Sequence, residues 1–328
     1  MIRHYTFSDE ASALALWNTA GTAMGYAPLD LARFRALLTE HPDFSPNYAF
    51  VLSFDGAVLG FCVGCTGGAM PRGDRLGYLT CLILAGEADT AENTALLLTA
   101  LEDAFRAAGR EKLAVSFFNP MLLPWILPGT PGHQHNNVPG VALGWPLYSR
   151  MLSLGYEETA REQAMYLDLS AFVYPQKMRD REAAMARDGY FVAQYDRTLH
   201  TGLVPMLESL GNPLWVSEIT EAAAQGQRLL VGLHGTTVVG FAGPIYPEET
   251  GRGYFSGIGV GPEFEHHGLG TLLFYRLCQA EREAGARYMS LFTGTDNPAR
   301  LIYAGAGFET KRVFGVLEKD LSSQGGRL

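Results

Sequence analysis

The stretch Tyr254–Leu273, with the sequence YFSGIGVGPEFEHHGLGTLL, decides the fold expected for this chain. Its first part, Tyr254 to Val260, is expected to form a strand, which Gly261-Pro262 would end sharply. A glycine-bearing loop follows, and a helix is expected to begin near Gly268. Free backbone amides at such a helix start, together with the positive end of the helix dipole, bind phosphate groups. The stretch therefore predicts a site for a pyrophosphate-bearing cofactor.

Length and composition indicate a globular protein with room for two domains. The chain has 328 residues, of which 47% are hydrophobic and 18% charged, as is typical of folded domains. Its net charge of −9 argues against a nucleic-acid partner, because no basic surplus is present to neutralise phosphates. No apolar run approaches the ~20 residues that span a bilayer, and the N-terminus lacks a signal-peptide pattern. We therefore expect no membrane partner and a cytoplasmic location, and leave homodimer formation open.

The cysteines and paired histidines do not predict a metal site. Cys62 and Cys65 form a C-x-x-C, but it falls in an expected strand, where positions three apart point to opposite faces. A second pair that could complete a zinc site is missing. His133 and His135 lie two apart in a loop without a carboxylate neighbour. We therefore expect structural roles for these residues and no bound metal.

The apolar pattern predicts the same succession of elements twice. In the first half, strands are expected at 2–7, 48–53, 57–65, 76–84, 113–118 and 163–169, and helices at about 8–18, 29–39, 91–108 and 146–154. In the second half, strands are expected at 190–195, 228–233, 237–245, 254–260, 288–292 and 310–318, and helices at 201–210, 213–224, 268–285 and 297–304. This order predicts an α/β protein of the α+β kind, with a mixed sheet in each half.

Direct comparison of the two halves indicates a duplication. The segment EDAFRAAGREKLAVSFF in the first half matches CQAEREAGARYMSLF in the second. In this register, Glu92 and Thr94 stand where the second half has the two glycines of its loop, and Met151 stands opposite Tyr303. The first half also holds an insertion, residues 120–146, which is rich in proline and glycine yet apolar, and we expect it to cover a domain partner, a subunit or a site. The predicted domains are 1–172 and 173–328, with a linking helix within 173–188.

The glycine loop does not fit the common nucleotide-binding motifs. A Rossmann domain needs G-x-G-x-x-G after its first strand, whereas this loop follows three consecutive strands. Pro262 also stands where the last glycine of that motif would be needed. No Lys-Ser/Thr follows the glycines, as a Walker loop requires.

The second half resembles the GNAT superfamily of N-acetyltransferases. The matching residues are Val260-Gly261-Pro262, then Gly268-Leu269-Gly270-Thr271-Leu272-Leu273, and the segment NPARLIYAGAGF from Asn297 to Phe308. The resemblance covers residues 189–320, and in the first half it persists only as strand order and spacing. It implies two tandem folds of this superfamily with a degenerate first domain, an arrangement similar to that of mycothiol synthase.

The resemblance implies acetyl-CoA as co-substrate and assigns residues to it. The strand residues would pair with the pantetheine arm, the loop amides would hold the pyrophosphate, and the later segment would complete the cofactor site. These cofactor-binding residues are Ile258, Gly259, Val260, His266, His267, Gly268, Leu269, Gly270, Thr271, Asn297 and Arg300. Tyr303 is implied as the general acid for the departing thiolate, a role that suits a phenol at hydrogen-bond distance. Asn297, before a proline, also predicts a helix N-cap.

Two features of the site depart from the family pattern or are left undetermined by it. Glu265 stands where the family has glutamine or arginine, and a carboxylate beside a pyrophosphate is unfavourable by Coulomb repulsion. His266 and His267 could compensate, or the side chain could turn to solvent. The general base is not specified; Glu248 and Glu249, in the loop before the strand, are the candidates, with Asp296 as a weaker one.

We therefore expect an acyltransferase that transfers an acetyl group from acetyl-CoA to a primary amine of a small molecule. Two alternatives stay open. One is a non-catalytic CoA-binding or sensor module, in which Tyr303 is only a packed aromatic residue. The other is an acetyltransferase for protein lysines or N-termini, which needs an open groove.

Overall fold

A computed structural model describes residues 1–68, 70 and 72–322 and divides the chain into two compact units. The first unit comprises residues 1–164, 292–295 and the segment that begins at Thr310; the second comprises 165–291 and 296–309. The units are therefore interleaved along the chain, whereas the sequence predicts two consecutive domains. Each unit is described by itself below.

The first unit is built on a mixed sheet in the order β1-β2-β3-β4-β5-β17. Neighbouring strands are antiparallel except β4 and β5, which are parallel. The predicted hairpin is present, because β2 and β3 pair on either side of Asp55-Gly56. The bounds are β1 Ile2–His4, β2 Ala49–Phe54, β3 Ala57–Cys65, β4 Leu76–Leu84, β5 Lys112–Val115 and β17 Glu309–Asp320. β3 and β4 match their predicted bounds.

Helices cover both faces of this sheet, and each face has its own core. The helices α1 (Glu10–Leu16), α2 (Thr22–Met24) and α3 (Leu31–Phe34), with π-helical turns after α1 and α3, enclose a cluster around Trp17 and Phe61. The helices α4 (Ala91–Ala107) and α5 (Pro146–Ser153) enclose a second cluster around Leu101 and Phe105. Cys62 packs in the second cluster and Cys65 in the first, so the C-x-x-C residues do lie on opposite faces.

Short strands occupy the insertion of the first unit. They are β6 (Trp125–Ile126), β7 (Gln134–His135) and β8 (Val141–Ala142), and β9 (Glu157–Asp168) follows α5. β6 pairs with β7, and β8 pairs with β17. The last strand of the chain is therefore bonded to β5 and β8 of the first unit, although the sequence pattern placed it in the second domain.

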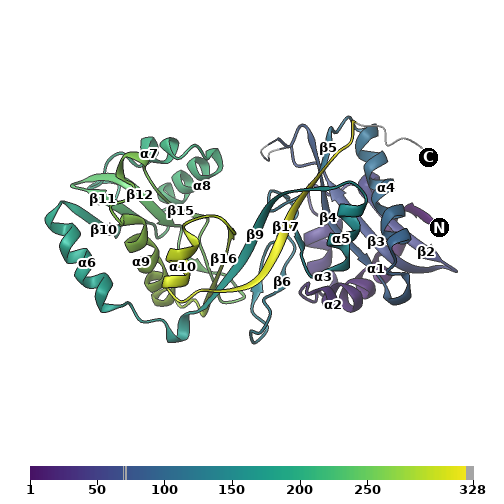
Figure 1. Ribbon diagram of the computed structural model, residues 1–328, viewed down its shortest axis with the longest axis horizontal. Coiled ribbons are helices and arrows are strands. Elements are labelled where there is room, and N and C mark those ends of the chain that lie inside the picture. Colours follow the sequence, from purple (N-terminus) through teal and green to yellow (C-terminus); the bar gives the residue numbers. More distant parts are fainter. Residues whose placement is uncertain (69, 71, 323–328) are drawn as a thin grey trace. The chain divides into compact units, whose positions relative to one another are not determined.

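The second unit contains an antiparallel sheet in the order β10-β11-β12-β15 (Figure 1). Between β12 and β15 in the chain lie β13 and β14, and β14 is antiparallel to β13 but parallel to β16. The bounds are β10 Tyr190–Gln194, β11 Leu230–His234, β12 Thr237–Gly243, β13 Tyr246–Pro247, β14 Arg252–Tyr254, β15 Gly257–Val260 and β16 Tyr288–Gly294.

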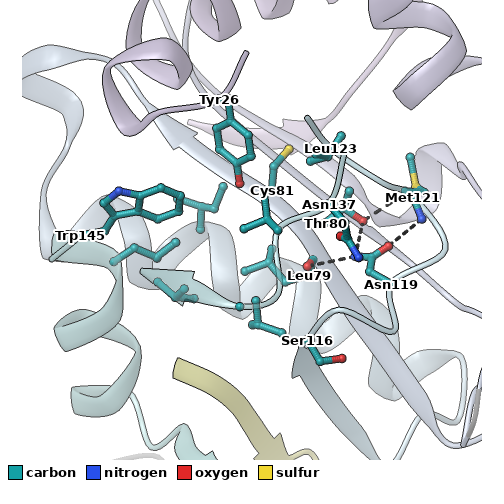
Figure 2. Close-up of a pocket in the computed structure, with 16 residues that line it drawn as sticks. Tyr26, Leu79, Thr80, Cys81, Ser116, Asn119, Met121, Leu123, Asn137 and Trp145 are labelled. Atoms are coloured by element: carbon teal, nitrogen blue, oxygen red, sulfur yellow. Dashed lines mark hydrogen bonds between the residues drawn. The ribbon is translucent and has the colours of Figure 1, made fainter. Parts of the chain in front are cut away.

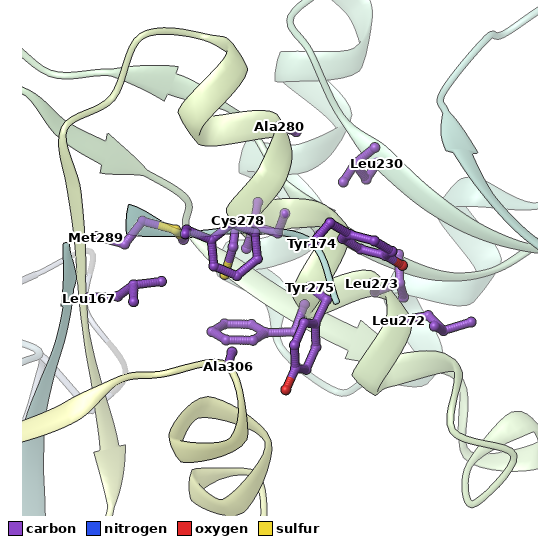
Figure 3. Close-up of a cluster of buried hydrophobic side chains, with 14 of the residues drawn as sticks. Leu167, Tyr174, Leu230, Leu272, Leu273, Tyr275, Cys278, Ala280, Met289 and Ala306 are labelled. Carbon is purple, nitrogen blue, oxygen red and sulfur yellow. The ribbon is translucent and has the colours of Figure 1, made fainter. Parts of the chain in front are cut away.

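Helices α7 and α8 lie on one side of this antiparallel sheet and α9 on the other (Figure 1). The core under α9 gathers Leu273, Cys278 and Met289 (Figure 3), and Phe274 belongs to the same core. The opposite core gathers Leu207, Ile219 and Phe241. The bounds are α6 Gln176–Arg187, α7 Leu203–Ser209, α8 Pro213–Ala224, α9 Leu269–Glu283 and α10 Arg300–Gly305.

Two predicted elements of the second unit need correction. The strand expected at 254–260 is broken at Phe255 and Ser256 into β14 and β15, because its two parts bond to different neighbours. The helix expected from Asn297 begins at Arg300, and its N-cap is Ala299. Asn297 instead forms a turn, in which its side-chain oxygen accepts a hydrogen bond from the backbone of Ala299 at 2.9 Å.

Candidate active site

The strand that precedes the glycine loop parts from its neighbour halfway along. β14 pairs with β16, with Arg252 opposite Tyr288. From Gly257 onward the chain pairs with β12 instead, and β15 becomes the edge of that sheet. Within the described part of the chain, the outer edge of β15 has no strand partner; the residues on it are Ile258, Gly259 and Val260. An extended ligand that carries amides can pair with such an edge.

The break between the two strands is held by specific contacts. The backbone N–H of Ser256 donates to Gly243 at 3.2 Å, and Nε1 of Trp215 donates to the carbonyl of Ser256 at 3.2 Å. A side chain at Gly257 would collide with the Trp215 ring. The glycine in β15 therefore lets α8 approach the strand closely, which places α8 beside the point where the strands part.

The loop after β15 turns sharply into the start of α9. His266 and Gly268 have positive φ angles of 64° and 86°, and α9 begins at Leu269 with Gly268 as its N-cap. The first-turn amides of a helix have no partner within the helix, and here they belong to Leu269, Gly270 and Thr271. His266 is exposed, and His267 stacks on Tyr190 with ring centroids 5.4 Å apart. A helix start of this kind is suited to bind an anion, and the role of these residues toward the cofactor stays a prediction.

Tyr303 lies on α10 and packs against the same core as the strand edge. Its ring contacts Phe274 of α9, with centroids 4.5 Å apart. Tyr303, Ile258 and Val260 all pack on the core under α9. Burial raises the pKa of the Tyr303 phenol, so the hydroxyl stays protonated at neutral pH. The fold therefore gathers the predicted general acid and the predicted pantetheine edge around one helix.

The remaining predicted cofactor residues lie at the surface. Asn297 is exposed in the turn before α10, and its backbone carbonyl accepts a hydrogen bond from Arg300 at 3.1 Å. Arg300 is the first residue of α10 and is also exposed. Their role toward the cofactor stays a prediction.

The two carboxylates predicted as bases differ in their surroundings. Glu248 accepts two hydrogen bonds from Arg252, from Nε and Nη2, each at 2.8 Å. Arg252 is itself buried, and Glu248 is half-buried. Glu249 is exposed in the adjoining turn. Both carboxyl oxygens of Glu248 are thus occupied by the guanidinium of Arg252, so the geometry does not favour Glu248 as the base.

A third carboxylate, which the sequence pattern did not reveal, lies where the strands part. Tyr254, the last residue of β14, donates a hydrogen bond from its hydroxyl to Oε1 of Glu218 at 2.8 Å. Glu218 is one helical turn after Trp215 on α8, so both side chains reach β14 and β15. Its sequence signal, a glutamate on an amphipathic helix, is shared by many surface residues. Only the packing of α8 on the strands distinguishes it.

The corresponding cleft of the first unit is filled by the insertion. β4 and β5 pair in parallel from Leu76 to Tyr78 and part beyond that point. Figure 2 shows Met121, Leu123 and Trp145 converging on β4 there. About 30 Å³ of free space is left, which suits a water molecule and not a pantetheine arm. The insertion thus covers a site-like cleft of its own unit.

The helix start of the first unit also differs from that of α9. Thr94 is fully buried, and its hydroxyl donates to the carbonyl of Thr90 at 2.8 Å and accepts from Arg150 at 3.2 Å. The side chain of Thr90 caps α4 by accepting a hydrogen bond from Asn93. The first turn of α4 is therefore occupied by its own side chains.

Among residues 1–68, 70 and 72–322, no group of three or more His, Cys, Asp and Glu side chains is placed to hold a metal ion. None of the helices formed by them has the length and apolar character needed to cross a membrane.

Comparison with known proteins was made for the sequence and for the fold. Residues 197–308 match the model of the acetyltransferase (GNAT) family. No curated protein matches the chain. A GCN5-related N-acetyltransferase from Sphaerobacter thermophilus superposes with a TM-score of 0.66 at 12% identity, over 98% of this chain and 95% of that one. A tandem GNAT protein from the clavulanic acid biosynthesis pathway superposes with a TM-score of 0.59 at 16% identity, over 99% of both chains.

A further similar structure is part of a larger protein. It is the GCN5-related glucosamine N-acetyltransferase region of a fungal multi-domain GH3 β-N-acetylglucosaminidase, with a TM-score of 0.70 at 15% identity. The match covers 97% of this chain and 38% of that one. At these identities the likeness concerns the fold.

Fold and site together define a protein of two tandem GNAT folds, a mixed α/β architecture. Residues 197–308 carry the sequence pattern of the acetyltransferase (GNAT) family, and the fold of the chain is that of tandem GNAT proteins. The predicted family and fold are thus confirmed. They support acyl transfer, and acetyl transfer in general, as the type of activity.

Proposed function

We propose that the second unit transfers an acetyl group from acetyl-CoA to a primary amine of a small molecule. One observation carries this proposal: a strand edge that has no strand partner among the described residues leads directly into a glycine loop and a helix start, and a half-buried tyrosine packs on the same core. The edge suits the amides of a pantetheine arm, and the helix start suits a pyrophosphate. The residues present therefore fit acetyl-CoA.

The roles of individual residues follow from their positions. Ile258, Gly259 and Val260 would bind the pantetheine arm, and the backbone from His266 to Thr271 would bind the pyrophosphate. When bound, acetyl-CoA supplies the acetyl group as an activated thioester. The amine nitrogen forms a bond to the carbonyl carbon as the carbon–sulfur bond breaks, and Tyr303 holds the proton that neutralises the departing thiolate.

The amine must also lose a proton, because an ammonium group has no lone pair with which to attack. Glu248 and Glu249 are the acceptors predicted from the sequence, and Glu218 is added by its contact with Tyr254 at the break between the strands. We place Glu218 first, because the carboxylate of Glu248 is bound by Arg252.

A thiol-release assay with acetyl-CoA over a panel of small amines tests this function. We expect turnover with at least one amine and none without an amine. Acetyl-CoA binding without turnover on any amine would favour the CoA-binding or sensor module instead. Turnover on peptides alone would favour a protein acetyltransferase.

A further inference from the structure

The proposed cofactor loop carries negative charge where it should attract phosphate. Glu263 and Glu265 lie in the loop, and a carboxylate near a pyrophosphate is repulsive. His266 and His267 carry a full positive charge only when protonated. A stable cation from elsewhere in the unit would offset this repulsion. The following inference rests on the proposed function, because it concerns the same acetyl-CoA site.

The guanidinium of Arg181 lies directly against the loop at Gly268. A Cβ atom built on Gly268 would overlap Nη2 and Cζ of Arg181 and would lie 2.7 Å from its Nε. Gly268 is the N-cap of α9. The arginine therefore packs on the residue at which the helix starts, and this close approach needs a glycine there.

Contacts between α6 and the rest of the second unit hold Arg181 in this place. Met178 and Met185, three residues before and four after Arg181, are buried in the core under α9. The adjacent residue, Glu182, accepts two hydrogen bonds from Arg276 of α9, at 2.5 and 2.6 Å, and one from the hydroxyl of Tyr174 at 2.7 Å. Residues close to Arg181 in the sequence thus pack and hydrogen-bond helix α6 against α9.

Arg181 itself has no competing partner. Its side chain is exposed, and within the described residues it makes no salt bridge or hydrogen bond. Nearby arginines differ: Arg276 is bound to Glu182, and Arg179 lies over the ring of Tyr174. An unpaired guanidinium that lies beside a helix start is suited to bind phosphate oxygens.

We propose that Arg181 of α6 is a cofactor-binding residue, which supplies to the CoA pyrophosphate the positive charge that the loop lacks. It takes the electrostatic role of the glutamine or arginine that Glu265 replaces, from a helix outside the loop. The acetyl and pantetheine parts of the cofactor do not need this residue.

Two ligands separate this role from a general effect on folding. CoA carries the phosphates, whereas S-acetylpantetheine has the same arm and thioester without them. Arg181→Ala is expected to raise the Kd for CoA about ten-fold, because one charge-assisted hydrogen-bonding group is lost. The Kd for S-acetylpantetheine should stay unchanged. Calorimetry measures the first value, and ligand-observed NMR the second.

Control variants show whether the loss of affinity is specific to the charge at Arg181. Arg187→Ala removes the same charge from an exposed position on the same helix and should leave CoA binding unchanged. The dependence of the CoA Kd on salt should become less steep in Arg181→Ala than in the wild type, because fewer charges act on the phosphates. Arg181→Lys should recover part of the affinity, since it restores the charge but not the planar fork.

The outcomes that overturn the proposal are distinct. If wild type binds CoA and the Kd of Arg181→Ala for CoA lies within about two-fold of the wild-type value, Arg181 has no role in binding. The proposed function then stands. Equal weakening of CoA and S-acetylpantetheine would show a structural role instead, and would also overturn the inference. If wild type binds no CoA at all, the proposed function falls and the inference falls with it.

Discussion

The ring of Tyr303 packs against the ring of Phe274, with the centroids 4.5 Å apart and the planes inclined by 48°. This contact joins α10 to the helix that begins at the glycine loop. It positions the hydroxyl through the ring, so the ring can stay in place when the hydroxyl is removed.

Tyr303→Phe should therefore reduce turnover without loosening the site. We expect kcat to fall about 100-fold, the usual contribution of a general acid, while the Kd for acetyl-CoA stays within about two-fold. The thiol-release assay and calorimetry measure these two quantities. Tyr275→Phe removes a hydroxyl from a neighbouring ring of α9 and serves as the control. Full activity of Tyr303→Phe would rule out its role as the general acid.

Alanine substitutions at the two loop glycines, Gly268 and Gly270, should differ in their effects on stability and on CoA binding. Gly268 has a φ of 86°, and its Cβ would overlap Arg181, so Gly268→Ala should lower the free energy of unfolding by about 1–2 kcal/mol and weaken CoA binding. Gly270 is helical, and its Cβ would lie 3.6 Å from Val260, an ordinary contact. Thermal unfolding and CoA calorimetry on both variants test this difference.

Gly270→Ala should fold as well as wild type, because alanine favours a helix more than glycine does. Any loss of CoA affinity in this variant then reports a close approach of the cofactor to the backbone. If Gly268→Ala were as stable as the wild type, the strain and the overlap with Arg181 would both be refuted.

Substitution of the three candidate carboxylates should have different effects on turnover and on the free energy of unfolding. Glu218→Gln should lower kcat about ten-fold or more near neutral pH, with little change in unfolding. Glu248→Gln should instead lower the free energy of unfolding by about 2 kcal/mol, because it weakens a bidentate pair with the buried Arg252. Glu249→Gln should change neither. Measuring the pH–rate profile and thermal unfolding for all three variants tests the assignment, and a normal profile for Glu218→Gln would contradict it.

Glu281 should make stability depend on pH. This residue of α9 is fully buried, and its two carboxyl oxygens have no hydrogen-bond partner among the residues that the structure describes. Burial raises the pKa of its carboxyl from 4.5 to about 9, against the opposing effects of Arg252 and Arg228. The folded chain therefore keeps a proton on Glu281 that the unfolded chain releases. As a result, the free energy of unfolding decreases as the pH rises from about 4.5 toward 9.

Glu281→Gln cannot ionise and should remove that pH dependence. We expect thermal unfolding of the variant to vary less than that of wild type between about pH 5 and pH 9, and the variant to be the more stable at the alkaline end. Glu283→Gln, at an exposed position of the same helix, is the matched control. A pH dependence unchanged in Glu281→Gln would show that the carboxyl is not buried in its neutral form.

The chain should bind one acetyl-CoA. The cleft of the first unit is filled by the insertion 120–146, and its helix start is occupied by Thr90 and Thr94. Calorimetry should therefore give one site per chain. Two sites would show that the first unit also accepts the cofactor, contrary to the packing around Trp145.

The sequence by itself determined the individual elements and the chemistry of the glycine loop. β3, β4 and α8 were predicted at their observed bounds, because apolar period and flanking turn residues act locally. The loop, its helix and the superfamily were also evident, since glycines at Gly268 and Gly270 satisfy a backbone requirement that neighbouring residues already define.

Only the tertiary structure decided which elements meet. The break at Phe255 and Ser256 arises because β14 and β15 bond to different strands. The alternation of apolar and polar side chains predicts a strand but does not determine which strand it pairs with. The pairing of β17 with the first unit, the contact of Glu218 with Tyr254 and the contact of Arg181 with Gly268 all join residues far apart in the chain. Such contacts depend on how helices and strands pack, so local sequence patterns could not show them.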